Sequence, residues 1–359
     1  MKVLTVIGAR PQFIKAAVVS HELRKKHTEV LVHTGQHYDY NMSELFFEEL
    51  DIPKPDYNLG ISGGSHAKMT GNMMIAVEEV LIKEKPDWLL VYGDTNSTLA
   101  AALAAAKLYI PVCHVEAGAR LHNRENPEEL NRICTDHVSS LLLACTENSF
   151  VEMKREGLDD RGVVVGDPMY DAFMKYSEIR DINSMSLTLL EGGAYSIPKQ
   201  YYYMTCHREE NTSDDSSLTG ILRAMEELDA PAIYPVHPRN HERALRLRKA
   251  LSLKNVVFTE PVGYLESTAL ARNAKKIVTD SGGLQREAFF AGVQCVTILD
   301  FGVWPETMVD NRNQLAKPNA KDILEKLSKE QKVDPSYQPF GDGHAGKRIV
   351  TELEQKGVS

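Results

Sequence analysis

The fold of this chain is decided by WLLVYGDTNSTLAAALAAAKLYIPVCHVEAG, residues 88–118. Two short apolar runs, 88–94 and 111–118, enclose a helical pattern over residues 97–109. This order predicts two parallel strands joined by a crossover helix. Because both runs are apolar almost throughout, we expect helices to cover both faces of their sheet.

The same alternation continues on both sides of this stretch. The further apolar runs before residue 180 are VLTVIG (3–8), VLVHTG (30–35), LLLACT (141–146) and GVVVGD (162–167). A polar, glycine-containing connection occupies about residues 180–200. The runs after it are YYYMTCH (201–207), PAIYPVH (231–237), NVVFTE (255–260), KKIVTD (275–280) and VQCVTI (293–298). The sequence predicts an α/β protein with two doubly wound domains that face a cleft.

Length and composition limit the class of protein. A chain of 359 residues is too long for one ordinary core, which favours two domains. With 43% hydrophobic and 25% charged residues, it has the composition of a soluble globular protein. A net charge of −9 argues against a nucleic-acid partner, because phosphate backbones are bound by clustered Lys and Arg. No apolar run suits a membrane span or a signal peptide, so we expect a cytoplasmic protein.

The cysteines indicate the same compartment. Five of them are widely spaced and lie mostly inside apolar runs, which is typical of reduced, buried thiols. No CxxC pair and no His/Asp/Glu set has the spacing of a metal site, so we expect no metal.

Polar residues gather where the predicted strands end. Asp94, Glu116 and His207 follow three apolar runs, and glycine-containing turns follow two more, at Gly8 and at 280–283. Open parallel sheets bind ligands at the carboxyl ends of their strands. Five strand ends that carry charge, imidazole or bare glycine backbone therefore predict a ligand site.

The segment TDSGGLQREA (279–288) favours a phosphate or diphosphate ligand. It leads from a strand into a helix, and Ser281, Gly282 and Gly283 lie at the helix start, where backbone N–H groups bind anions. Glu287, one turn further, could accept from both hydroxyls of a ribose. An ordinary strand–helix turn is the alternative. The Walker pattern and GxGxxG are missing, so neither ATP nor NAD is indicated and we expect no cofactor.

Two cations in GARPQFIK (8–15) could contact the same anion. Pro11 favours a helix start, which places Arg10 before the helix and Lys15 about one turn inside it. Both could then point at an anion over the helix N-terminus. A pair of surface charges is the alternative.

The segment GDTNST (93–98) ends a strand at Asp94 and starts a helix. Asp, Thr, Asn and Ser are favoured N-cap residues, so capping is the alternative to a role in the site. Asp94 and Asn96 cannot both be the cap, which leaves one polar group over.

The segment PEELNR (127–132) starts another helix. Glu128 and Glu129 lie near the positive end of its dipole, which stabilises them by a few tenths to about 1 kcal/mol. This structural role suits Glu129. We expect Glu128 to face back toward Glu116.

Histidines follow other strands. His207 and Arg208 in TCHREEN (205–211) are candidate acid and phosphate-binding groups. His237 in YPVHPRN (234–240) is a weaker candidate, and so are Gln36 and His37. A structural role is the alternative for each.

Several segments in this order resemble the UDP-N-acetylglucosamine 2-epimerase family. They are GARPQFIK, GQH, GDTNST, HVEAG, PEELNR, HRE-N, YPVHPRN, TDSGGLQREA and FGDGHAGKRI (340–349). The resemblance implies two Rossmann-like domains of the glycosyltransferase-B type. Residues 1–175 and a returning helix, 343–359, would form the first domain, and residues 176–342 the UDP-binding second.

The resemblance implies a reaction without NAD or metal, in which C2 of a UDP-N-acetylhexosamine is inverted. Loss of UDP would give 2-acetamidoglucal, and UDP would then add back. Asp94, Glu116 and Glu128 would transfer protons, His207 and Arg10 would stabilise the departing diphosphate, and Glu287 would bind the ribose. The family also implies a cytoplasmic homodimer that serves polysaccharide biosynthesis.

The sequence departs from the family's common pattern at several places. It has GARPQ for GTRPE, EAGAR for EAGLR and GVWPE for TTERPE. QHYDYNM and Asn72 stand where regulated members bind an activating UDP-sugar. These segments look more like the branch acting on UDP-2,3-diacetamido-2,3-dideoxyglucuronic acid, whose carboxylate would need a cation such as Arg120 or Arg124.

Other functions are open to the same residues. A hydrolysing relative would release a free N-acetylmannosamine-type sugar, although retention of Arg10, Lys15 and His207 favours an enzyme that holds UDP. A non-catalytic UDP-sugar-binding protein would need the phosphate site but not Asp94, Glu116 and Glu128 together. A retaining glycosyltransferase fits the acid-rich strand ends less well.

Overall fold

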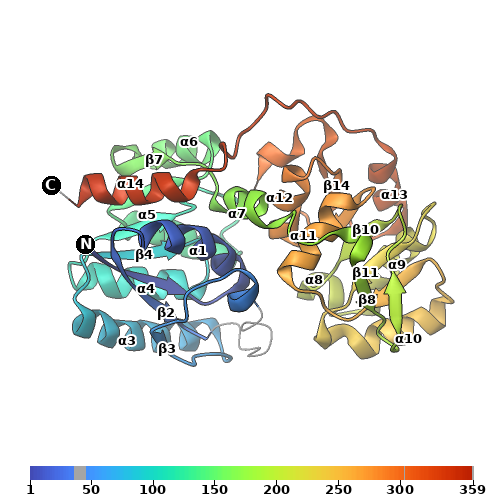
Figure 1. Ribbon diagram of the computed structural model, residues 1–359, viewed down its shortest axis with the longest axis horizontal. Helices are drawn as coiled ribbons and strands as arrows, with labels where there is room; N and C mark the ends of the chain where they lie inside the picture. Colours follow the sequence, from blue (N-terminus) through green and yellow to red (C-terminus); the bar gives the residue numbers. More distant parts are fainter. Residues whose placement is uncertain (36–45, 303, 358–359) are drawn as a thin grey trace. The chain divides into compact units, whose positions relative to one another are not determined.

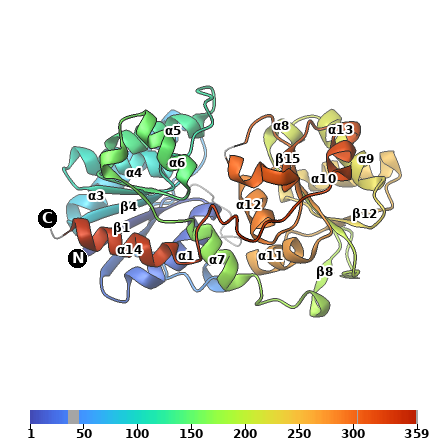
Figure 2. The ribbon, with the colours of Figure 1, turned by 90° about the horizontal axis from the view of Figure 1, so that it is seen from above.

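A computed structural model describes residues 1–35, 46–302 and 304–357 of the chain. The chain divides into two compact units (Figures 1 and 2). Unit 1 comprises Met1–Met174 and Gln338–Ser359, and unit 2 comprises Lys175–Tyr337. Across the described residues, no helix combines the length and apolar character that a membrane span requires.

Unit 1 is built on a seven-stranded parallel sheet with the order β3-β2-β1-β4-β5-β6-β7. Its strands are β1 (Lys2–Ile7), β2 (Thr28–His33), β3 (Tyr57–Asn58), β4 (Trp88–Tyr92), β5 (Val112–Val115), β6 (Leu141–Ala144) and β7 (Gly162–Val164). Its helices are α1 (Arg10–Leu23), α3 (His66–Glu84), α4 (Asn96–Lys107), α5 (Pro127–Val138), α6 (Glu147–Arg155), the 3₁₀ turn η1 (Asp159–Arg161), α7 (Pro168–Tyr176), which runs on into unit 2, and α14 (Ala345–Lys356).

The core of unit 1 follows from the apolar strands. Leu4 and Val6 of β1 and Leu89 and Val91 of β4 are fully buried, and they pack with Val77 of α3. The side of α4 that faces this core is made of alanines, which favour a helix and let it approach the sheet closely. On the other side of the sheet, the last helix, α14, lies beside α1 although the two are far apart in sequence (Figures 1 and 2).

Unit 2 contains a six-stranded parallel sheet with the order β12-β11-β10-β13-β14-β15. Its strands are β10 (Tyr202–Thr205), β11 (Ala232–Pro235), β12 (Val256–Thr259), β13 (Ile277–Thr279), β14 (Cys295–Thr297) and β15 (Asn313–Leu315). Its helices are η2 (Ile182–Ser184), α8 (Glu209–Thr212), α9 (Asp215–Glu226), η3 (Pro238–Asn240), α10 (His241–Leu251), α11 (Tyr264–Asn273), α12 (Gly282–Phe290), η4 (Pro305–Asn311) and α13 (Ala320–Ser328).

The prediction of two α/β domains with parallel sheets is confirmed. The polar connection around residues 180–200 is more ordered than the sequence suggested, because it forms the antiparallel pair β8 (Ser186–Thr188) and β9 (Ala194–Ser196). Gly192 and Gly193, both at positive φ, make the turn between these strands. All five cysteines are free, and Cys134 is the exposed one.

Gly118, just after β5, tests how tightly this strand end is packed. A Cβ there would lie 2.2 Å from the backbone oxygen of Ser149, at a φ of 76°. Gly157 has a φ of 70° with nothing within 4 Å of its Cβ position, and so serves as the control. We expect G157A to cost about 1 kcal/mol through backbone strain and G118A about 1–3 kcal/mol more through overpacking, both measured by urea unfolding. Equal costs would contradict the packing.

Candidate active site

Glu116 lies at the carboxyl edge of the unit 1 sheet, one residue beyond β5. Its backbone N–H donates at 3.0 Å to the carbonyl oxygen of Leu143 in the neighbouring strand β6. Its φ is 75°, a left-handed conformation that a residue with a side chain rarely adopts. Strained backbone of this kind persists only where the surroundings enforce it, and it clusters at functional sites.

The Glu116 carboxylate forms a buried ion pair with the Lys15 ammonium of α1. The two side chains are only 6% and 2% exposed. Gly93 lies beside the pair, since a Cβ at this position would be in ordinary contact with Lys15 Nζ at 3.5 Å and Glu116 Oε1 at 3.6 Å, and its φ of 64° favours glycine. The sequence suggested that Lys15 points at an anion over the start of its helix, whereas the structure directs it to Glu116.

Asp94 forms the second ion pair at this edge, with Arg132 of α5. Asn131 Nδ2 donates to the Asp94 carbonyl at 2.8 Å and to Asn96 Oδ1 at 3.3 Å. The N-cap of α4 is Thr95, whose hydroxyl accepts from the N–H of Thr98. Neither Asp94 nor Asn96 is therefore used as the cap, because Asp94 pairs with Arg132, and Asn96 is buried and bonded to Asn131 and His66.

The two glutamates at the start of α5 have different environments. Glu129 is buried and accepts the backbone N–H groups of Leu121 and His122, both at 2.9 Å. Arg132 Nη1 lies 3.5 Å from its carboxylate. Glu129 thus holds the loop that follows β5, while Glu128 is exposed in the first helical turn.

Gln12 explains one departure from the family pattern, where an acid is usual. Its buried side chain accepts the N–H groups of Gly8 and Ala9 at 2.8 and 3.0 Å. Its amide nitrogen donates to Tyr92 O at 2.8 Å and reaches the Thr98 hydroxyl at 2.9 Å. An ionised carboxylate could not donate to the Tyr92 carbonyl, so this strand-end network suits the amide.

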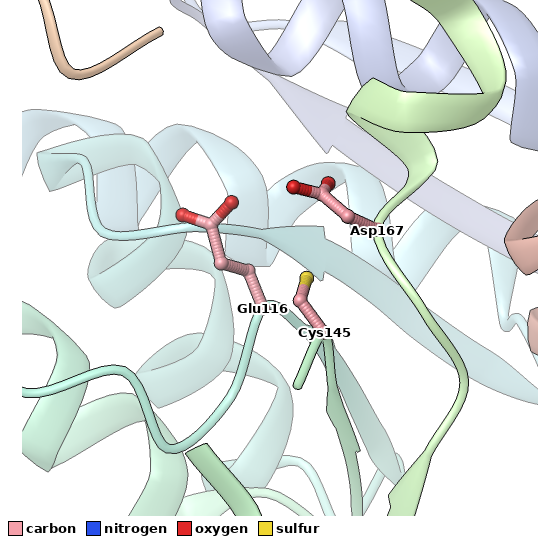
Figure 3. A group of neighbouring side chains, drawn as sticks. All are labelled: Glu116, Cys145 and Asp167. Atoms are coloured by element: carbon pink, nitrogen blue, oxygen red, sulfur yellow. The ribbon is translucent and has the colours of Figure 1, made fainter. Parts of the chain in front are cut away.

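Glu116 belongs to a group of three potential metal ligands (Figure 3). One ligand atom each of Glu116, Cys145 and Asp167 lies within 4.8 Å of the others, and all three residues are buried. Such a group could bind a soft divalent cation. However, the Lys15 ammonium already contacts the Glu116 carboxylate and supplies a positive charge there. The donor set therefore does not fit a resident metal.

Arg10 and Arg120 have different environments. Arg10 is partly exposed, with its guanidinium 5.6 Å from the ring centre of Phe46. Arg120 is buried and bonded to Asp136 and Glu156. Of the two arginines suggested for a uronate, Arg120 is thus engaged within the protein, and Arg124 is exposed. Gln36 and His37 lie outside the described residues.

In unit 2, Asp280 organises the strand end that carries His207 and Arg208. Its fully buried carboxylate accepts the backbone N–H groups of both residues, at 2.9–3.1 Å. Asn211 Nδ2 donates to it at 3.3 Å. His207 Nδ1 lies 3.2 Å from Asp280 Oδ1, yet the side chain is 45% exposed. Asp280 thus holds an imidazole that remains accessible.

The start of α12 has the features expected of an anion site. The Ser281 hydroxyl caps the helix by accepting from the N–H of Leu284 at 3.3 Å. Gly282 and Gly283 are the first two helical residues, and a Cβ on Gly282 would meet nothing within 4 Å. The N–H of Leu284 already donates to Ser281, so the groups of this turn that suit a phosphate are the N–H groups of Gly282 and Gly283.

Glu287 lies one turn further along α12 and is buried. Burial raises the pKa of its carboxyl to about 7, against the lowering effects of Arg286 and of a hydrogen bond with Tyr264. His237 has a structural contact, since its Nδ1 accepts from the N–H of Arg239 at 3.3 Å and caps η3. Arg208 lies 5.8 Å from the ring centre of Phe301.

The structure assembles some of the predicted residues into two groups. Lys15 and Glu116 meet beside Gly93 in unit 1, where Asp94 follows in the chain and pairs with Arg132. His207, Arg208 and the Ser281 turn lie around Asp280 in unit 2. Sequence reasoning missed a set of buried partners of these residues: His114, Arg132, Asp136, Cys145 and Asp167. Two of these had a sequence signal that could have identified them, because Asp167 closes the predicted strand run GVVVGD (162–167) and Cys145 lies near the end of LLLACT (141–146).

The chain has two α/β units, each with a parallel sheet. One unit carries ion-paired acids at its sheet edge, and the other has an open helix start. These features define an enzyme of the glycosyltransferase-B fold class. The family model for UDP-N-acetylglucosamine 2-epimerase matches residues 21–354. The chain belongs to the UDP-N-acetylglucosamine 2-epimerase family and is an isomerase of that type, as the resemblance of its motifs indicated. Arg10 and Lys15 lie ahead of the matched region.

Similar proteins cover nearly the whole chain. A UDP-N-acetylglucosamine 2-epimerase homolog of Methanococcus maripaludis is 45% identical over 98% of this chain and 99% of its own. The UDP-2,3-diacetamido-2,3-dideoxy-D-glucuronate 2-epimerase of Pseudomonas aeruginosa is also 45% identical, with the same coverage. The crystal structure of Methanocaldococcus jannaschii UDP-GlcNAc 2-epimerase with UDP-GlcNAc and UDP has a TM-score of 0.88, at 38% identity over 99% of this chain and 100% of that one.

The raised pKa of Glu287 predicts a pH-dependent stability. Because the folded pKa of about 7 exceeds the ordinary value of 4.5, the unfolded chain loses this proton first as pH rises. The contribution of Glu287 to the free energy of unfolding is fully present below the pKa of the unfolded chain. It is lost as pH rises to and through the pKa of the folded protein, by about 3 kcal/mol in total. In urea unfolding from pH 5 to pH 8, E287Q should lack this loss. The exposed Glu242 provides the control, and E242Q should follow the wild type; parallel curves for all three proteins would refute the assignment.

Proposed function

We propose that this protein inverts C2 of a UDP-N-acetylhexosamine without releasing the sugar. The observation that carries the proposal is the buried Lys15–Glu116 pair beside Asp94. Paired charges at a strained strand end suit proton abstraction, which needs a fixed carboxylate. The open start of α12 and the accessible imidazole of His207 support binding of a diphosphate.

The reaction needs bases and acids on two faces of the sugar. A carboxylate removes the weakly acidic C2 proton while the C1–O bond to UDP breaks, and a C1–C2 double bond forms. The products of this step are 2-acetamidoglucal and UDP, whose diphosphate takes the bonding electrons. Re-addition of UDP at C1 with protonation at C2 from the other face gives the epimer. Atoms and charges balance without an oxidant or a metal.

We take the roles within this scheme from the family resemblance, and the contacts of Glu116 and His207 support them. Glu116, Asp94 and Glu128 carry the proton transfers. Lys15 stabilises the ionised form of Glu116, since an opposite charge at contact distance favours the carboxylate. Arg10 and His207 stabilise the departing diphosphate, the Ser281 turn binds it, and Glu287 binds the ribose.

The identity of the sugar has two candidates. Relatives named for UDP-GlcNAc and for the 2,3-diacetamido uronate are equally similar, at 45% identity for the first two. We propose the uronate as the better candidate, on the segments GARPQFIKAA, HTGQHYDYNMS and WPET. Arg124 is the exposed cation next to the site's loop that could bind the additional carboxylate.

Proton NMR of the protein with each UDP-sugar in heavy water tests the reaction. The expected result is deuterium at C2 together with the C2 epimer, still bound to UDP. Free sugar plus UDP would mean hydrolysis instead. If both UDP-sugars bind but neither exchanges its C2 hydrogen for deuterium, the protein is a non-catalytic UDP-sugar-binding protein.

Variants test the assignment of Glu116. E116Q preserves the size of the side chain but removes the base, so kcat should fall by about 10²–10⁴-fold, with UDP affinity from calorimetry unchanged. Glu125, exposed in the same loop region, provides the control, and E125Q should keep wild-type kcat. Full activity of E116Q would exclude Glu116 as a proton-transfer residue.

A further inference from the structure

His114 lies at the centre of unit 1, two residues before Glu116, and is completely buried. Its Nε2 contacts the Gly93 carbonyl at 2.7 Å, and its Nδ1 contacts Asp136 Oδ1 at 2.6 Å. The ring therefore joins the end of β5 to the end of β4 and to helix α5. None of the roles proposed above uses it.

The hydrogen bonds define the protons on the ring. A carbonyl can only accept, so Nε2 must carry a hydrogen and donate to Gly93. Asp136 Oδ2 accepts from the N–H of Gly118 at 3.0 Å and from Arg120 Nη2 at 2.7 Å. Burial acts to raise the pKa of Asp136, but His114 and Arg120 outweigh it and hold the pKa below its usual range. The ionised Asp136 thus holds the ring at Nδ1, opposite the bond to Gly93.

This arrangement restrains both acid-bearing strand ends at once. Gly93 directly precedes Asp94, and the stretch from His114 to Gly118 contains Glu116. Gly93, Glu116 and Gly118 all adopt positive φ, at 64°, 75° and 76°. The turn after β4 is held by the bond between His114 and Gly93, and the turn after β5 is held by the bond between Gly118 and Asp136. Arg120 is held in turn by Glu156 through bonds of 2.7 and 2.9 Å.

We infer that His114, held by Asp136, is a positioning residue that sets the relative placement of the Asp94 and Glu116 carboxylates. The inference rests on the proposed proton transfers by these two acids. The two contacts of the ring have different roles. The bond to Gly93 links the strand ends, whereas the bond to Asp136 fixes the ring. Misplacement of a catalytic group by about 1 Å can cost about 10²-fold in rate.

Two substitutions at His114 test its two contacts separately. In H114N the side-chain amide takes the place of Nδ1 and can still donate to Asp136, but it cannot reach Gly93. In H114Q the amide takes the place of Nε2 and preserves the bond to Gly93. Thr5 provides a matched control in the same sheet, because its buried hydroxyl bonds Glu29 at 2.7 Å and T5V removes that bond.

The measurements are kcat, KM and the isotope effect with a UDP-sugar deuterated at C2. We expect H114N to lower kcat by about 10–100-fold, keep KM within about twofold and raise the isotope effect, because proton abstraction becomes slower. H114Q should restore most of kcat, and T5V should match the wild type in all three. Equal losses in H114N and H114Q with an unchanged isotope effect, or wild-type kcat in H114N, would overturn the inference.

A second variant covers the case in which neither His114 substitution folds. D136N keeps the shape of Asp136 but removes the charge that fixes the ring, so it should reproduce the H114N pattern. If D136N folds and behaves like T5V, His114 has only a structural role. Failure of the proposed function itself is distinguished by the wild type, which would then show no C2 exchange with either UDP-sugar.

Discussion

The buried pair of Lys15 and Glu116 is the interaction on which the edge of unit 1 depends. Removing two charges from water costs several kcal/mol per ion, and only close pairing with further hydrogen bonds offsets this. A pair of apolar side chains of similar size would often be as stable or more stable. Retaining the pair at a strained strand end is therefore better explained by chemistry than by stability.

The two units use the same physical device to hold their strand ends. In unit 1 the fully buried Asp136 accepts the N–H of Gly118, and in unit 2 the fully buried Asp280 accepts those of His207 and Arg208. A buried carboxylate with several donors is rigid, because losing any one of them leaves an unsatisfied charge. Each acid thus fixes the loop after a strand, and in unit 2 the His207 side chain of that loop remains accessible. Such supporting shells are what keep functional groups in place.

The fold was largely predictable because its signal is local. Apolar strands alternating with helices predict parallel sheets from any part of the chain, and strand ends indicate the edge at which a site lies. The site was only partly predictable. The polar residues of GDTNST could be listed, but Thr95 proved to be the cap, leaving Asp94 free to pair with Arg132. Lys15 was expected over a helix start and instead pairs with Glu116, which is far away in the sequence.

The sequence by itself determined the order of strands and helices, the two parallel sheets and the family, since these depend on periodicity and on short motifs. Only the tertiary structure decided which charges meet. The pairs His114–Asp136 and Glu116–Lys15 each join the end of β5 to a helix, and these elements come together only when the helices pack on the sheet. Burial then decides their strength, because the same charges in water would attract only weakly. Composition and spacing carry no record of that burial, which arises only when the helices cover the sheet.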